Sequence, residues 1–219
     1  MRFSLIAKSA EWLNEMAVQH HYMRQAIHQR ACPFGWGVAF DGQVCQLDGR
    51  PAGFIAFASI HYTRLRGEFG YPGLPTKWQV LSLARLWLHP DFQAGGRYFS
   101  PEILPGFTDR KGAFRSTLAT TVIKVSLGLV QNRFLEVHPP RFPDEPYHVL
   151  KIISYVNMSR FTGEIYRAAS FRDNGPTRSQ KRHKNSRGPG IGNVELRRYI
   201  LDLEPPGWDY QPLQPRLLK

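Results

Sequence analysis

The sequence predicts an α/β (α+β) domain in which a mixed, mostly antiparallel central sheet is flanked by helices. Three observations lead to this fold class. Turn signals separate short apolar runs over residues 34–60, which is typical of an antiparallel meander. Apolar residues recur at helical spacing after Ser9 and over residues 113–137. A buried strand, a polar turn and a short helix follow one another over residues 149–172.

The length of 219 residues fits one domain, which we place at residues 1–203, with a Pro-rich tail over residues 204–219. A hydrophobic content of 42% excludes a disordered chain. No apolar run has membrane-spanning length, and the first residues lack a signal-peptide core, so we expect no membrane partner. Cys32 and Cys45 provide no disulfide framework, and we expect both to be reduced in a cytoplasmic protein.

The net charge of +12 indicates a partner rich in phosphate, either a nucleic acid or a phosphorylated cofactor. Residues 160–198 hold ten Lys and Arg against three Asp and Glu, which is more than half of the excess. Within them we interpret residues 172–192 as a basic loop before the last strand that follows a nucleic-acid backbone; the alternative is a solvated loop without such a partner. The residues expected to bind nucleic acid are Arg172, Arg178, Lys181, Arg182, Lys184 and Arg187.

The first elements are a strand over residues 1–7 and a helix capped by Ser9. His20 and His21 come at the end of this helix. Adjacent histidines cannot share a helical face, so a metal site would combine one of them with a distant partner. Ordinary surface or core histidines are the more frequent alternative.

The meander consists of strands at residues 36–40, 44–47 and 51–60, with a hairpin signal at Asp48-Gly49 between the last two. A loop rich in Gly and Pro then covers residues 64–79 and is a possible lid or partner-binding face.

The strand expected at residues 80–89 carries Arg85. An arginine is costly to bury unless it is paired or binds an anion; the alternative is a side chain that faces solvent from an alternating strand. After this strand, Gln93 and Gly96 fit the start of a pyrophosphate-binding loop, although Tyr98 interrupts the pattern.

Residues 91–112 look like an insertion, and the long helix follows at residues 113–137. Arg115 and Ser116 near its start suit a phosphate at the positive helix end, whereas an ordinary capping serine explains Ser116 equally well.

The central strand is expected at residues 149–156, followed by a polar turn and a helix that opens at Gly163. This order places Asn157 and Tyr166 near one strand end, where ligands gather in open α/β sheets. A closing strand is expected at residues 194–203.

This order of elements is similar to the GNAT acetyltransferase fold, and the chain more specifically resembles the Mom family of phage DNA-modification proteins, a divergent branch of that fold. Ser82 and Asn157 depart from that family, which usually has Glu and Asp there. The matching motifs are His21-Tyr22, Phe34-Gly35-Trp36-Gly37-Val38 with Asp41-Gly42 and Gly53-Phe54-Ile55, Leu83-Ala84-Arg85-Leu86, Arg115-Ser116-Thr117-Leu118, Ser154-Tyr155-Val156-Asn157, and Gly163-Glu164-Ile165-Tyr166-Arg167-Ala168 with Gly175-Pro176-Thr177.

The resemblance implies a transferase that uses acetyl-CoA to carbamoylmethylate the exocyclic amine of adenine in double-stranded DNA, with Fe2+ implicated, in the host cytoplasm if a phage encodes it. It implies catalytic roles for His21, Tyr22, Asn157 and Tyr166. The first three are also the implied metal ligands, although an asparagine cannot be deprotonated. Implied cofactor contacts are Arg85, Leu86, Leu88, Arg115 and Ser116.

Two other functions remain open at the sequence level. One is an N-acyltransferase of the same fold with a different amine acceptor. The other is a DNA-binding module that has lost its chemistry. For Tyr166, the implied role is a general acid for the departing thiolate, and the alternative is a buried tyrosine with a satisfied hydroxyl. A homodimer is a further partner state that the sequence leaves open.

Overall fold

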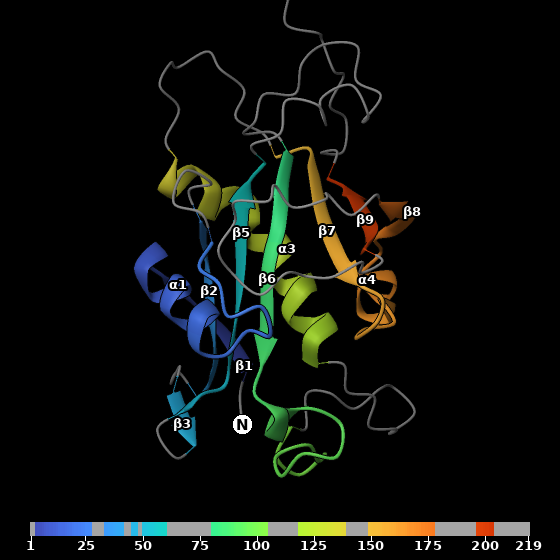
Figure 1. Ribbon diagram of the computed structural model, residues 1–219. Coiled ribbons are helices and arrows are strands. Elements are labelled where there is room, and N and C mark those ends of the chain that lie inside the picture. The colour runs from blue at the N-terminus through green and yellow to red at the C-terminus, as the bar shows by residue number, and fades with distance from the viewer. Residues whose placement is uncertain are drawn as a thin grey trace, which may run out of the picture.

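The protein is a seven-stranded mixed sheet with one helix layer on each face (Figure 1). The computed structural model describes residues 3–27, 33–41, 45–47, 50–60, 80–104, 118–138, 149–177 and 196–203. The strand order is β1-β2-β5-β6-β7-β9-β8, and only the β6–β7 pair is parallel. The predicted fold class is therefore confirmed. The main-sheet strands are β1 (Phe3–Lys8), β2 (Phe34–Phe40), β5 (Gly53–Ser59), β6 (Val80–Leu88), β7 (Lys151–Asn157), β8 (Arg172–Thr177) and β9 (Leu196–Asp202).

The helices α1 (Ala10–Gln19) and α3 (Leu118–Val137) lie on opposite faces of the sheet, in front of it and behind it in Figure 1. Successive side chains of β5 point to opposite faces of the sheet, so this strand packs against both helix layers. Phe54 packs with α1, whereas Ile55 and Phe57 pack in the larger core against α3. The remaining elements are α4 (Glu164–Ala168), the short helix η2 (Pro90–Phe92) and a separate hairpin of β3 (Cys45–Leu47) and β4 (Arg50–Pro51).

The predicted cap of α1 is confirmed, because Ser9 accepts a hydrogen bond from the backbone N–H of Trp12 at 3.3 Å. The chain after α1 is tied back to the helix, since Asn14 Oδ1 accepts from the backbone N–H of Ile27 at 2.7 Å. Ile27 is itself buried with the α1 core. These contacts fix the segment that carries His21 and Tyr22.

The segment after η2, where the sequence predicts a pyrophosphate-binding loop, forms a hydrogen-bonded turn. The backbone N–H of Gly96 donates to the Gln93 carbonyl at 2.8 Å, and the Gln93 side chain donates to the Leu88 carbonyl at 2.7 Å. A Cβ on Gly96 would collide with the backbone of Asp91, so glycine serves a close chain approach there. Gln93 and Gly96 therefore use their own N–H groups to close this turn, and anion binding by the loop stays a prediction.

The prediction of a loop over residues 172–192 is wrong at its start, because Arg172–Thr177 forms strand β8 at the edge of the sheet. An ion pair between Arg197 and Asp173, with an N–O distance of 3.1 Å, links β8 to β9. Gly175 has φ +79°, and the register shifts between Asp173 and Pro176. Further predictions fall outside the described residues: the lid loop at 64–79, the helix start at 113–117, Cys32, the basic residues at 178–192 and the tail at 204–219.

Candidate active site

The candidate site lies where β6 and β7 part in the middle of the sheet (Figure 1). Their parallel pairing covers only three residue pairs, from Val80–Lys151 to Ser82–Ile153. Beyond it, β6 stays paired with β5 to Leu88, and β7 stays paired with β9 to Asn157. The facing backbone edges of β6 and β7 are therefore not paired with each other along this stretch. Such edges require other hydrogen-bond partners, which a ligand can supply.

A β-bulge in β6 sits beside this parting. Ala56 pairs with Arg85 and the next residue, Phe57, pairs with Leu83, so Ala84 is an extra residue on β6. Before the bulge, Leu83 faces the α3 core; after it, Leu86 and Leu88 face that core again. Ala84 and Trp87, on either side of Arg85, pack toward α1, and Arg85 itself pairs with Ala56 of the α1 core.

Arg85 carries a largely buried guanidinium without an acidic partner in the described part of the chain. Its Nη1 donates to the carbonyl of Ala84 at 2.7 Å, whereas its buried Nε has no hydrogen-bond partner among the described residues. Burial lowers the pKa of Arg85, and the neighbouring Tyr22 hydroxyl opposes that shift. Between the two alternatives for this residue, the structure shows Arg85 partly buried, with its Nε closed off from solvent.

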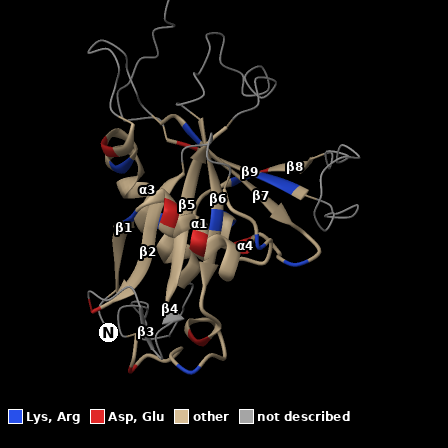
Figure 2. Cartoon of the chain, turned by 60° about the vertical axis from the view of Figure 1, so that its left-hand side comes forward, with Lys and Arg blue, Asp and Glu red and all other residues tan. Residues whose placement is uncertain are grey.

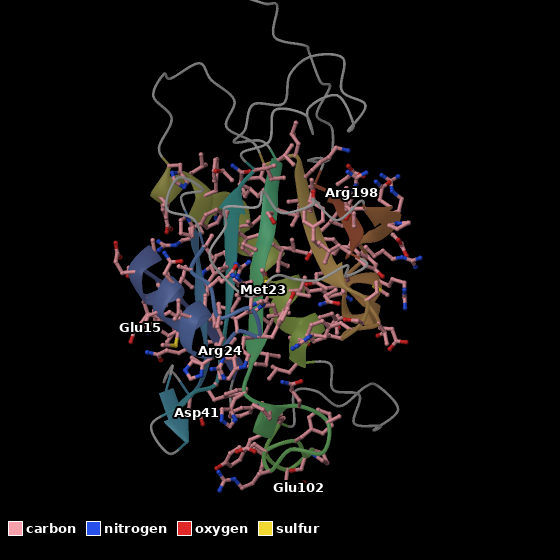
Figure 3. The ribbon with its side chains drawn as sticks, viewed as in Figure 1. Glu15, Met23, Arg24, Asp41, Glu102 and Arg198 are labelled. Carbon is pink, nitrogen blue, oxygen red and sulfur yellow. The ribbon has the colours of Figure 1, made fainter. Side chains whose placement is uncertain are left out.

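His21 and Tyr22 interact electrostatically with Arg85 from the segment that follows α1, which passes in front of β6 near Met23 (Figure 3). His21 is 6% exposed, and its Nδ1 accepts the backbone N–H of Met23 at 3.3 Å. Burial, together with the charge of Arg85, lowers the pKa of His21 to about 3. His21 is therefore neutral at pH 7 with its proton on Nε2, where it donates a hydrogen bond and is a weak base.

Tyr22 links the segment after α1 to the turn after β7. Its ring centroid lies 4.3 Å from that of His21 and 5.5 Å from that of Phe161, which follows β7. The guanidinium of Arg160 lies over the Tyr22 ring at 5.4 Å. Burial raises the pKa of Tyr22 although the charges of Arg85 and Arg160 act in the opposite direction. Tyr22 and Phe161 both remain substantially exposed, so this aromatic pair is accessible from solvent.

Asn157 ends β7 and closes the turn that leads to α4. Its Oδ1 accepts from both the backbone N–H and the hydroxyl of Ser159, at 3.0 and 2.6 Å. Its carbonyl accepts from the backbone N–H groups of Arg160 and Phe161. Asn157 thus positions the two residues that flank Tyr22, and its side-chain oxygen is already engaged.

Tyr166 is held by contacts from three elements. Its hydroxyl hydrogen-bonds to the Ser154 side chain on β7, and its ring stacks on Tyr199 of β9 with the centroids 5.4 Å apart. Phe171 packs on another edge at 5.6 Å. Burial raises the pKa of Tyr166 to about 12, while the Ser154 hydrogen bond opposes the shift. The hydroxyl is therefore protonated across the neutral range.

Gly163 sets the position of α4 against Tyr199. It caps the helix with φ +75°, a conformation that favours glycine. A Cβ at this position would collide with the Tyr199 hydroxyl and lie 2.5 Å from its Cζ. This close approach brings the helix of Tyr166 onto β9.

Four predicted site residues, His21, Tyr22, Arg85 and Tyr166, are linked by their electrostatic effects on one another. Sequence reasoning missed the residues that support them, namely Ser154, Arg160, Phe161 and Tyr199. Tyr199 carried one usable signal, because it is an apolar position within a strand of mixed charge.

Among the residues that the structure describes, the other side chains implied to bind the cofactor or iron do not gather in this site as the resemblance implies. Leu86 and Leu88 direct their side chains into the α3 core, so only their backbone is available to a cofactor. Arg115 and Ser116 lie outside the described residues. Within the described ranges, no three His, Cys, Asp or Glu side chains gather as a metal-binding group. Because His21 Nδ1 and Asn157 Oδ1 already accept hydrogen bonds, the implied iron ligands do not form a fitting donor set.

The predicted nucleic-acid residues are mostly outside the described residues, where most of the net charge also lies. Arg172 is described: its side chain is exposed at the β8–β9 edge and pairs with Asp202 at 3.4 Å. Figure 2 shows basic positions at this edge. None of the described helices is long and apolar enough to cross a membrane.

Neither a protein-family model nor a curated protein sequence matches the chain, so the resemblance to the Mom family stays a prediction. Solved structures do match over nearly the whole chain. NAA60 of Arabidopsis thaliana in complex with acetyl-CoA matches with a TM-score of 0.50 at 9% identity, covering 92% of this chain and 99% of that chain.

Two further matches are weaker. A protein from Desulfovibrio desulfuricans assigned to the GNAT acetyltransferase family has a TM-score of 0.46 at 10% identity, covering 92% of this chain and 99% of that chain. The structure of yncA from Salmonella typhimurium with its cofactor acetyl-CoA has a TM-score of 0.46 at 8% identity, covering 92% and 94%. The strand order and the NAA60 match give this chain the GNAT fold.

Proposed function

We propose that the protein is an acetyl-CoA-dependent N-acyltransferase whose active site is the parting of β6 and β7. The observation that carries this proposal is the bulged edge of β6, which parts from β7 and has no strand partner among the described residues. Tyr166 is held on the β7–β9 side of this parting by Ser154 and Tyr199. NAA60, a structure of the same fold, contains acetyl-CoA, which supports the choice of donor.

The residues present fit this donor. Acetyl-CoA contains an extended chain with two amide groups, and such a chain can pair with a free strand edge as an added strand does. The unpaired edge of β6 from Leu83 to Leu88 offers backbone N–H and C=O groups for this pairing. When bound there, acetyl-CoA would supply an activated acyl thioester.

Tyr166 would hold a proton for the sulfur that leaves the acyl group. Its raised pKa keeps the hydroxyl protonated, and the Ser154 hydrogen bond and Tyr199 stack fix its position. A positioned O–H stabilises a departing thiolate by hydrogen bonding and by proton transfer, which typically contributes about 10²–10⁴-fold to the rate.

The finer proposal is that the acceptor is the exocyclic amine of adenine in DNA. The sequence resemblance and the basic charge support it. His21 adds a physical reason, because it is a weak base at neutral pH. An alkylamine is protonated at pH 7 and needs a base before it attacks, whereas an aromatic amine is already neutral. The exposed rings of Tyr22 and Phe161 would hold an adenine that leaves the stack. We propose no iron site.

The donor proposal is tested by measuring acetyl-CoA binding and CoA release with wild type, Tyr166→Phe and the control Tyr98→Phe. We expect unchanged binding and a loss of about 10²–10⁴-fold in kcat for Tyr166→Phe alone. Full turnover by Tyr166→Phe, or no binding of acetyl-CoA by the folded wild type, would contradict the proposal.

The acceptor proposal is tested by mass spectrometry of nucleosides from DNA of cells that express the protein. A heavier deoxyadenosine that disappears with Tyr166→Phe would support adenine and give the mass of the added group. If acetyl-CoA binds but every nucleoside is unchanged, the enzyme acts on another amine.

A further inference from the structure

The Arg85 guanidinium differs from the other buried arginines of the described chain. Three of them have a buried Nε without a hydrogen-bond partner: Arg85, Arg133 and Arg197. Arg133 pairs with Glu136 at 2.8 Å, and Arg197 pairs with Asp173 at 3.1 Å. Among the described residues, the only hydrogen-bond acceptor of the Arg85 side chain is the neighbouring carbonyl of Ala84, which holds the guanidinium without neutralising it.

The two side chains that interact electrostatically with Arg85, those of His21 and Tyr22, can each donate a hydrogen bond. His21 uses its Nδ1 as an acceptor for Met23, which leaves the Nε2–H to donate. Tyr22 packs its ring on that of His21 with the centroids 4.3 Å apart, carries a hydroxyl that can donate, and interacts electrostatically with Arg85. A cation flanked by two neutral donors favours a ligand that only accepts hydrogen bonds and carries negative charge.

The side of the sheet on which Arg85 lies indicates whether the acyl acceptor or the cofactor carries this negative charge. Arg85 pairs in register with Ala56, which belongs to the α1 core, and its neighbours Ala84 and Trp87 pack toward α1. It also interacts electrostatically with His21 and Tyr22, which follow α1. Helix α3, as described from Leu118 onward, belongs to the opposite helix layer. A charge bound by Arg85 therefore enters from the α1 side.

We propose that Arg85, with His21 and Tyr22, binds an oxyanion carried by the acyl acceptor on the α1 face of the sheet. The assignment of the oxyanion to the acyl acceptor rests on the proposed function, whereas the binding of an oxyanion by Arg85 does not. The oxyanion is a carboxylate if the acceptor is a small amine, and a phosphate if the acceptor is a nucleotide or nucleic acid. Arg85 then selects the acceptor and does not hold the cofactor.

The test measures the shift in thermal unfolding midpoint caused by sodium acetate and by inorganic phosphate, against sodium chloride at equal ionic strength. Wild type, Arg85→Gln, Arg85→Lys and the control Arg133→Gln are compared. We expect stabilisation of wild type and Arg133→Gln and at least a tenfold weaker apparent affinity in Arg85→Gln. Arg85→Lys should retain part of the effect, because it keeps the charge but loses the planar fork. The stronger of the two anions identifies the carboxylate or the phosphate source.

Three results would overturn the inference: no oxyanion effect on wild type, an equal effect on Arg85→Gln, or abolition of the effect by saturating acetyl-CoA. The last result would assign Arg85 to the cofactor. Binding of acetyl-CoA is recorded in the same titrations. An Arg85-dependent oxyanion effect without acetyl-CoA binding would therefore refute the proposed function while retaining the anion site.

Discussion

Replacing Gly163 by alanine tests how the fold holds Tyr166, and Gly175 provides a matched control. Both glycines have left-handed backbone, with φ +75° and +79°. A Cβ on Gly175 would meet nothing within 4 Å, whereas a Cβ on Gly163 would collide with the buried Tyr199. The two substitutions therefore share a backbone cost and differ in a steric one.

The magnitudes follow from these two contributions. A left-handed alanine costs about 1–2 kcal/mol, which is the whole expected loss in the free energy of unfolding for Gly175→Ala. Gly163→Ala adds the cost of overpacking against a fully buried ring, about 1–3 kcal/mol. We expect a total loss of about 2–5 kcal/mol for Gly163→Ala, measured by urea unfolding with an unchanged m-value.

The activity of the same variants links this packing to the site. Tyr199 stacks on Tyr166, so a ring displaced by the new Cβ moves the proposed proton donor. We expect kcat to fall in Gly163→Ala and to stay near wild type in Gly175→Ala. Equal stability losses in the two variants would show that α4 moves away from Tyr199 at no cost, and the argument that Gly163 positions Tyr166 would be wrong.

Three further predictions follow from the buried groups. His21 becomes protonated near pH 6.5 in the unfolded chain but only near pH 3 in the folded protein, so the free energy of unfolding should fall by about 1.4 kcal/mol for each pH unit below pH 6.5. The His21→Gln variant should flatten this slope in urea titrations. An unchanged slope contradicts the assignment. Because the pKa of Tyr166 is raised to about 12 in the folded protein, its contribution to the free energy of unfolding is present below pH 10 and is lost as pH rises toward 12. The Tyr166→Phe variant should lose less stability over this range. Equal alkaline unfolding curves for the variant and wild type would refute this prediction. Removing the unpaired buried charge in Arg85→Met should leave the urea midpoint unchanged or raise it, and a strong decrease would mean that Arg85 has a stabilising partner.

Most of the fold could be predicted because its elements carry strong local patterns. Ser9 precedes a helical apolar period, and the run at 152–156 is too apolar for an exposed segment. Strand β8 could not be found this way, since Arg172–Thr177 is charged, mostly exposed and interrupted by Gly175 and Pro176. Among the described strands, this one pairs only with β9, and the pairing stabilises an extended conformation that its own residues do not favour.

The residues of the candidate site could be named from the sequence, but their arrangement could not. His21 reaches Arg85 only because the chain after α1 folds back through the Asn14–Ile27 hydrogen bond. Tyr22 meets Phe161 across more than a hundred residues of sequence. Such contacts depend on the order of strands in the sheet, which no local period encodes.

The β6 bulge did have a sequence signal, and it leads to one more test. The core-facing residues are Leu81, Leu83, Leu86 and Leu88, so the period of two is broken once by an extra residue. Deleting Ala84 should restore regular pairing with β5 and keep all four leucines in the core. We therefore expect a folded variant with a cooperative urea transition and at least a tenfold loss of acetyl transfer, because bulges next to active sites direct backbone and side-chain groups. Deletion without loss of transfer would show that the bulge only accommodates the strand, and the site would then rest on the parting of β6 and β7 alone.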